Sequence, residues 1–287
     1  AVANAVGAPL GGTLLNLDGI LGFAGWEWVF LATGVPAVLA GIATLFLLPD
    51  RPEQAAFLDN TEKAWLAQRL ASEDVGIDSH SGNPLAALLD ARVLLMSVCF
   101  IGFPLSAYGL SYWLPTIVKS FGFDNLSNGF LNIIPWVLVA IGLYVVPTAA
   151  ARSRSQTPYI VGPALVGIVC LVASAILTNH TLQFAFLCVA AAGIFAGQPV
   201  FWNLPSKFLK GAGAAAGLAA INSVGNLGGF IAQNVVPWIR DATGSATAPM
   251  FFLAFCLAIT ALLVLVVQYS ITRKGASPLP ENLIRRT

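Results

Sequence analysis

Two asparagines in a Gly-rich apolar stretch are the side chains best suited to bind a polar ligand. Asn222 and Asn226 lie four residues apart in GLAAINSVGNLGGF (217–230), and a helix places residues at that spacing on one face. Their amide groups can donate hydrogen bonds to a carboxylate. Buried amides also bond across membrane helices, so ligand contact and interhelical bonding both stay open.

Further neutral side chains could line the same site: Tyr108, Tyr112, Gln198, Trp202 and Asn203. The two tyrosines precede Pro115, where their phenol groups suit a gate or a ligand hydroxyl. An aromatic belt at the membrane surface is the alternative for them. Trp202 and Asn203 lie at the predicted end of a helix before Pro205, where Trp202 could wall a cavity or simply pack.

The sequence offers no acid–base or metal-binding cluster at the centre of its predicted membrane segments. In the last six of them no Asp, Glu, His, Lys or Arg lies between the ends, although such residues are functional candidates by default. Glu27 lies near a helix end, where a solvated interfacial carboxylate is favoured over a role in coupling. The motifs H-E-x-x-H, G-x-S-x-G and the P-loop are absent. We predict no catalytic residue, no metal, no cofactor and no enzyme activity.

Membrane-spanning helices must position these side chains. Apolar residues make up 57% of the 287 residues and charged residues 9%, against about 25% charged in ordinary soluble chains. Residues 25–48 form an apolar run of spanning length, and six further spans are predicted at 93–115, 128–150, 159–178, 183–205, 214–239 and 249–271. The net charge of +1 gives no support for a nucleic-acid partner. The sequence therefore predicts an all-α membrane protein.

A polar segment, residues 49–92, separates the first full span from the other six. It holds eight of the thirteen acidic residues and is too polar to cross a membrane. Within it, Asp59 and Glu62 suit a capping box that opens a short helix. If this segment is cytoplasmic, twelve of the fourteen Lys and Arg residues lie on its side, all except Lys119 and Arg240. The excess of Lys and Arg on cytoplasmic loops then predicts a cytoplasmic C-terminus.

Two G-x-x-x-G pairs predict close helix packing. Gly7 and Gly11 lie in VGAPLGG (6–12), and Gly225 and Gly229 lie in VGNLGG (224–229). Small residues at this spacing let membrane helices approach closely. Each pair precedes one final span and a polar segment, which indicates two six-helix repeats with the first four helices missing. Repeated bundles around a central site are typical of secondary transporters.

The chain resembles the anion:cation symporter family of the major facilitator superfamily. The resemblance lies in GAPLGGTLLNLDGILGFAGWEWVFLATGVPAVLAGIATLFLLPDRPE (7–53), TEKAWLAQRL (61–70), YGLSYWLPTIVKSFG (108–122) and FWNLPSKFLKGAGAAAGLAAINSVGNLGGF (201–230). It implies twelve helices in two bundles, of which this chain holds helices 5–12. We accordingly expect a piece of a longer protein. Its predicted parts are the last two helices of an N-terminal bundle (1–48), a cytoplasmic linker (49–92), a C-terminal six-helix bundle (93–271) and a cytoplasmic tail (272–287).

The family resemblance also implies a function, namely proton-coupled symport of organic anions such as phthalate, tartrate and glucarate by alternating access. The expected partners are a small organic anion, the proton and the lipid bilayer, and we expect a monomer that crosses the cell inner (plasma) membrane several times. The proton-coupling charge is expected in helices 1–4. The alternative is a non-transporting membrane protein on the same fold, such as a sensor or an orphan subunit.

Overall fold

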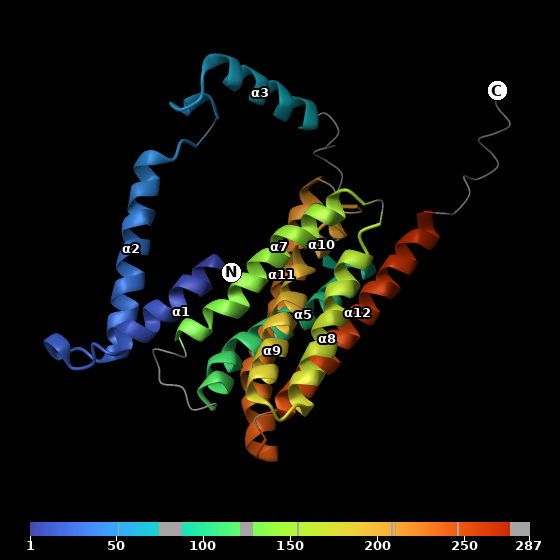
Figure 1. The fold of residues 1–287 in the computed structure, drawn as a ribbon. Coiled ribbons are helices and arrows are strands. Elements are labelled where there is room, and N and C mark those ends of the chain that lie inside the picture. The colour runs from blue at the N-terminus through green and yellow to red at the C-terminus, as the bar shows by residue number, and fades with distance from the viewer. Residues whose placement is uncertain are drawn as a thin grey trace.

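Every described element of the chain is a helix (Figure 1). The computed structural model describes residues 1–50, 52–74, 88–120, 129–153, 155–207, 209, 211–245 and 247–275. The α-helices are α1 (Val2–Leu15), α2 (Gly25–Leu47), α3 (Asn60–Asp74), α5 (Ala91–Ser120), α7 (Ile133–Ala151), α8 (Pro158–Ile176), α9 (His180–Ala196), α10 (Gln198–Phe201), α11 (Gly211–Thr243) and α12 (Ala248–Gly275). Short 3₁₀ turns occur at Ile20–Gly22, Pro52–Gln54 and Pro205–Lys207. Residues 75–87 of the predicted linker and 276–287 of the predicted tail lie outside the described part.

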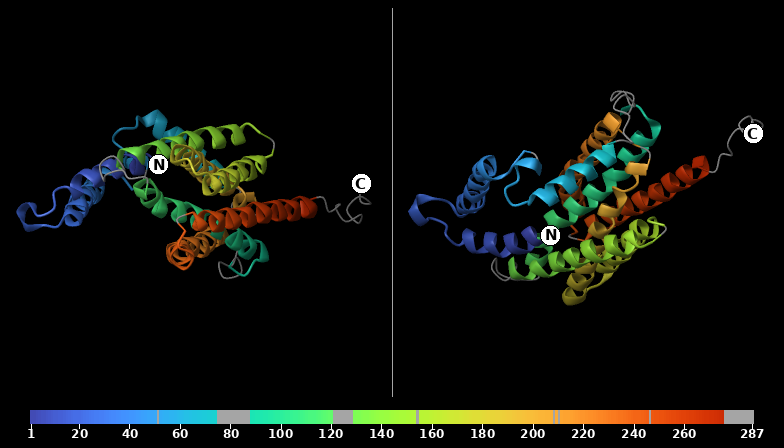
Figure 2. Two further views of the ribbon diagram at one scale, coloured as in Figure 1. Left: turned by 60° about the horizontal axis from the view of Figure 1, so that its bottom comes forward. Right: turned by 90° about the horizontal axis from the view of Figure 1, so that it is seen from above.

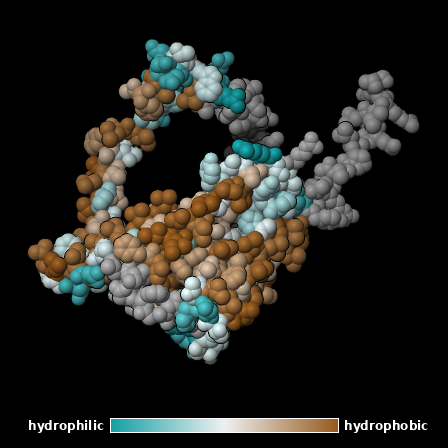
Figure 3. Space-filling view, in the orientation of Figure 1, coloured by the Kyte–Doolittle hydropathy of each residue, from teal (hydrophilic) through white to brown (hydrophobic). Residues whose placement is uncertain are grey.

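Seven helices in the described part are long and apolar enough to cross a membrane. They are Gly25–Leu47, Ala91–Leu114, Gly129–Ala151, Pro158–Ile176, His180–Phe201, Gly213–Thr243 and Ala248–Gln268, and α1 is a shorter apolar helix. Hydrophobic surface covers the bundle, whereas hydrophilic residues gather on α3 and at the ends of the helices (Figure 3). The predicted all-α membrane fold is confirmed, and each predicted span is found within four residues at either end.

The predicted span 183–205 is interrupted inside its length. Helix α9 ends at Ala196, Gly197 follows, and α10 begins at Gln198. Pro199 has no N–H with which to continue the α-helical hydrogen bonds. A Cβ at Gly197 would lie 3.0 Å from the Ile160 carbonyl oxygen, so this interruption lies against α8. The membrane helix ends at Phe201, four residues before the predicted end at Pro205, and Pro205 opens a 3₁₀ turn.

Helix α5 is the centre of the six-helix bundle. It packs along α11 and α12, while α8 joins α12 to α9 and α7 packs on α9. At the α5–α11 contact, a Cβ on Gly228 would overlap the Ile101 carbonyl oxygen and lie 2.9 Å from the Leu105 nitrogen. At the α8–α9 contact, a Cβ on Gly193 would lie 2.6 Å from the Gly167 nitrogen. The absence of a side chain at these positions is what allows the backbones to approach so closely.

The predicted packing glycines differ in their surroundings. Gly225 and Gly229 lie against the rings of Phe100 and Tyr108 of α5, and a Cβ on Gly229 would lie 2.6 Å from Tyr108 Cδ2. No atom of the described residues lies within 4 Å of a Cβ built on Gly7 or Gly11. Helix α1 instead meets the bundle where its residues 8 and 9 touch Gly129. The packing role of Gly7 and Gly11 has no partner in the described chain and stays a prediction.

Helices α1 and α2 form a hairpin beside the six-helix bundle (Figure 2). The loop between them is held by carboxylates, because Asp18 Oδ1 accepts from the Gly25 N–H at 2.7 Å and Glu27 Oε2 accepts from the Ala24 N–H at 2.7 Å. Both bonds satisfy N–H groups at the start of α2 that have no helical partner. Glu27 thus serves as a helix-capping group at the end of its span.

The polar segment after α2 contains the predicted capping box. Asp59 Oδ1 accepts from the Glu62 N–H at 2.7 Å, and Glu62 Oε2 accepts from the Asp59 N–H at 3.1 Å. This reciprocal pair fixes the first turn of α3. Trp65 on this helix is exposed, and Figure 1 shows α3 standing away from the bundle.

Candidate functional site

A cavity of about 710 Å³ lies between α1 and the six-helix bundle. This volume is within the range of about 300–1,000 Å³ that is usual for small-molecule sites. Its walls come from α1, α5, α7, α9, α10 and α11, together with the residue after α10. The lining residues are Asn4, Gly7, Ala8, Phe100, Pro104, Ala107, Tyr108, Ser111, Trp136, Phe195, Gln198, Trp202, Asn222 and Asn226.

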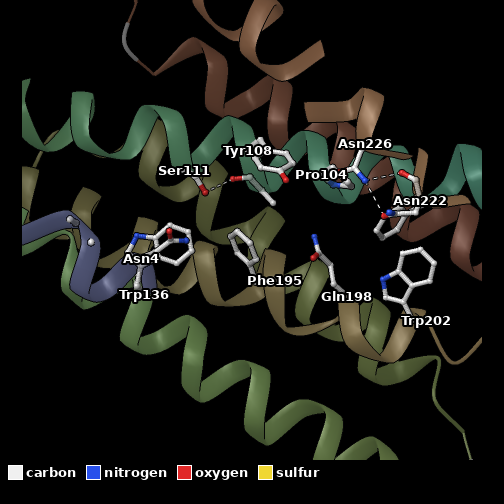
Figure 4. A pocket seen from close by; sticks show the side chains of 14 residues that line it. Asn4, Pro104, Tyr108, Ser111, Trp136, Phe195, Gln198, Trp202, Asn222 and Asn226 are labelled. Atoms are coloured by element: carbon white, nitrogen blue, oxygen red, sulfur yellow. Dashed lines mark hydrogen bonds between the residues drawn. The ribbon is translucent and has the colours of Figure 1, made fainter. Parts of the chain in front are cut away.

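The two asparagines of α11 are hydrogen-bonded to each other within the cavity wall. Asn226 Nδ2 donates to the Asn222 carbonyl oxygen at 2.8 Å and to Asn222 Oδ1 at 3.0 Å. In Figure 4 both amides face the cavity near Pro104 of α5. The hydrogen bonds of this pair run along α11, and in the described part of the chain neither amide bonds to another helix. Ligand contact by the pair stays a prediction.

The break between α9 and α10 brings Gln198 into the site. Gln198 is the first residue of α10, and Figure 4 shows its amide pointing from this helix toward the side chains of α5 and α11. Among the described residues no hydrogen bond is formed by the Gln198 amide or by the Tyr108 hydroxyl. Two neutral polar groups are therefore available to a ligand from opposite walls.

Aromatic rings line the cavity at opposite ends, where Figure 4 shows Trp136 and Trp202. Trp202 packs against Phe100 with ring centroids 4.6 Å apart and planes at 64°, so it fills both roles considered for it, cavity wall and packing. At the other end, Trp136 meets Phe195 with centroids 5.5 Å apart in an edge-to-face arrangement. Figure 4 shows Asn4 of α1 beside Trp136. The ends of the cavity thus offer apolar faces, and polar groups lie along its length.

Five of the seven predicted binding residues come together at this cavity: Tyr108, Gln198, Trp202, Asn222 and Asn226. Tyr112 and Asn203 do not line it. The ring of Tyr112 packs edge-on against Trp113 at 5.9 Å, and the Asn203 carbonyl oxygen accepts from Ser206 Oγ at 2.9 Å. Ligand contact by all seven residues stays a prediction.

Sequence reasoning missed Asn4, Ser111, Trp136 and Phe195 as cavity residues. Ser111 lies between the two predicted tyrosines and was the easiest to find, although its hydroxyl donates to the Ala107 carbonyl oxygen at 2.7 Å. Asn4 could have been identified from the sequence, because it is a polar residue in an apolar helix. Trp136 and Phe195 carried none, because an aromatic residue in a membrane helix is common in cores and at lipid surfaces alike.

The described lining contains no Asp, Glu, His, Lys or Arg, and the described residues contain no group of three or more potential metal ligands. The cavity can therefore hold a ligand through neutral hydrogen-bond donors and aromatic faces. Neutral amide N–H and phenol O–H groups can donate hydrogen bonds to carboxylate oxygens.

Comparison with known proteins identifies a family whose members this chain resembles. The sequence model described as Major Facilitator Superfamily matches residues 1–233. A putative tartrate transporter of Agrobacterium vitis is 35% identical over 269 residues, which cover 94% of this chain and 60% of the relative. A quinolone resistance transporter of Acinetobacter baumannii is 37% identical over 275 residues, 95% of this chain and 63% of that protein.

The inner membrane transport protein RhmT of Escherichia coli strain K12 is 32% identical over 276 residues, which cover 94% of this chain and 63% of the relative. The chain thus spans about 60–63% of the length of these curated relatives.

Proposed function

The chain belongs to the Major Facilitator Superfamily, and from that premise we propose that it forms part of a secondary active transporter that moves an organic anion by alternating access. Proteins of this family are membrane transporters and not enzymes, so the chain is a multi-pass membrane protein. Several relatives are named as transporters, and two of them as putative tartrate transporters. Organic acids are therefore the first substrates to test.

The observation that carries this proposal is the cavity between α1 and the six-helix bundle. Its polar lining consists of amides, hydroxyls and indole groups, which can donate to carboxylate oxygens. No carboxylate among the described lining residues would repel an anion. The aromatic faces at its ends can pack against the carbon skeleton of an acid.

The helix break at Gly197 is the proposed moving part of the site. The residues around it connect Gln198 and Trp202 to α9, whereas α5 runs unbroken through Pro104. Helix termini and loop residues absorb the backbone changes of gating motions. We propose that rocking of residues 1–48 against the bundle of residues 93–271 opens the cavity alternately to the two sides, with α10 as a gate.

Proton coupling is a further part of the proposal. The described lining holds no carboxylate or imidazole that could carry the coupled proton. Glu27 is engaged as a helix cap. We therefore place the coupling group in the part of the complete protein that corresponds to helices 1–4 of the family.

Uptake into proteoliposomes tests the proposed function. The protein expressed from the complete coding sequence, reconstituted with an imposed proton gradient, is expected to accumulate radiolabelled tartrate, phthalate or glucarate. Dissipating the gradient with a protonophore should abolish accumulation. Folded protein that takes up none of these acids would contradict the organic-anion proposal and favour a non-transporting role. Uptake that ignores the gradient would contradict only the coupling.

A further inference from the structure

The hydrogen bond between the two asparagines of α11 settles which atoms face the cavity. A backbone carbonyl oxygen can only accept, so the Asn226 atom 2.8 Å from the Asn222 carbonyl is the amide nitrogen. That nitrogen also lies 3.0 Å from the Asn222 side chain. The Asn222 atom at that distance must then be its oxygen, because two N–H groups cannot bond to each other.

This orientation leaves Asn222 as a donor toward the cavity. Its Oδ1 is occupied by Asn226, and in the described residues nothing accepts from its Nδ2. Asn226 has the opposite character, since its Nδ2 donates to two oxygens of Asn222 and its Oδ1 has no hydrogen bond among the described residues. An unconstrained amide could rotate by half a turn and present its oxygen instead, which would repel a carboxylate.

We infer that Asn226 is a positioning residue that holds the Asn222 amide with its two N–H donors toward the ligand. This inference rests on the proposed function and deepens it, because it makes the Asn222 end of the cavity selective for groups that accept hydrogen bonds, such as a carboxylate. Asn226 acts through Asn222 and needs no contact with the substrate.

Asn234 provides a matched control on the same helix. Its Nδ2 donates to the Phe230 carbonyl oxygen at 2.8 Å, which repeats the backbone bond made by Asn226. Asn234 is exposed, does not line the cavity and, among the described residues, forms no bond to a second side-chain amide. A substitution at Asn234 therefore removes the same backbone hydrogen bond without altering the orientation of Asn222.

A double-mutant cycle tests the inference. The binding of tartrate, phthalate and glucarate is measured by calorimetry on detergent-solubilised protein made from the complete coding sequence. Asn226→Leu is expected to weaken binding of the acid with the highest affinity about fivefold, which is the usual contribution of one hydrogen bond to a binding constant. In an Asn222→Ala background the same substitution should change affinity by less than about twofold, because the group that it orients is gone. Asn226→Gln, which retains an amide, should recover part of the loss, and Asn234→Leu should bind as the unaltered protein does.

The possible results separate the two proposals. Equal losses from Asn226→Leu in both backgrounds would contradict positioning, since Asn226 would then act on the ligand directly or on the fold. A loss with Asn234→Leu as large as that with Asn226→Leu would assign the effect to the backbone bond and also overturn the inference. Unaltered protein that binds none of the three acids would overturn the proposed function and this inference with it.

Discussion

Replacing Gly228 with alanine is expected to separate α5 from α11 and to destabilise the bundle by about 1–3 kcal/mol, the usual cost of overpacking. The added Cβ would overlap the Ile101 carbonyl oxygen and approach the Leu105 nitrogen at 2.9 Å. Both atoms belong to the backbone of α5, so neither can move aside by a change of side-chain rotamer. Since α5 and α11 also supply Tyr108, Asn222 and Asn226 to the cavity, a shift between these helices should weaken ligand binding as well. Thermal unfolding of purified protein in detergent measures the first effect.

Gly162→Ala is the matched control for this substitution. Gly162 lies inside α8, and no atom of the described residues lies within 4 Å of a Cβ built there. Alanine is favoured over glycine in a helix by up to about 1 kcal/mol, so this variant should unfold at the same temperature as the unaltered protein or slightly higher. If Gly228→Ala behaved like Gly162→Ala, the close approach of α5 and α11 would be contradicted.

Asn222→Asp is expected to reduce the affinity for organic anions on the order of a hundredfold. The substitution keeps the shape of the side chain but replaces its N–H donors with a carboxylate in a cavity whose described lining is uncharged. Two like charges about 4 Å apart repel each other by about 4 kcal/mol at the effective dielectric constant of a protein surface. Protonation of the new carboxylate or water in the cavity would reduce this penalty, so the loss should be smaller at acidic pH. Equilibrium binding at two pH values measures both effects.

The same change at Asn203 serves as the control. Asn203 is exposed, lies one residue after Trp202 and does not line the cavity. Asn203→Asp adds the same charge near the site, so it should alter affinity by less than about twofold, which is the scale of a screened surface charge. Comparable losses at both positions would show that long-range charge dominates, and they would contradict direct contact with Asn222.

Composition and periodicity predicted the helices because membrane spans need long apolar runs, and the capping box at Asp59 was readable from local sequence alone. The break at Gly197 was missed because apolar residues resume at Val200, directly after Gln198 and Pro199. A Pro within such a run can kink a helix, end it or lie in its first turn. The structure places Gly197 against Ile160 of α8, a contact that sequence spacing does not reveal.

The site was only partly predictable for a similar reason. Tyr108 and Tyr112 share a helix face by spacing, yet only Tyr108 lines the cavity, and Tyr112 packs on Trp113. The G-x-x-x-G pattern identified Gly225 and Gly229, but the glycine that meets the backbone of α5 is Gly228. Asn4 and Trp136 are far apart in the chain, so only the tertiary packing of α1 against α7 brings them to one cavity.

Protection of an engineered thiol tests most directly whether this cavity holds the substrate. Gln198→Cys places a thiol at the cavity wall. Of the native cysteines, Cys99, Cys170 and Cys188 are buried and Cys256 is only partly exposed. The unaltered protein therefore gives the background rate of thiol modification. Ser206→Cys, exposed and outside the cavity lining, is the control position. Saturating amounts of the transported acid should slow modification of the Gln198→Cys variant by a small anionic thiol reagent at least about tenfold, since a buried ligand excludes other molecules from most of its surface. The Ser206→Cys variant should react at an unchanged rate. An acid that binds without slowing the reaction of the Gln198→Cys variant would contradict the assignment of this cavity as the substrate site.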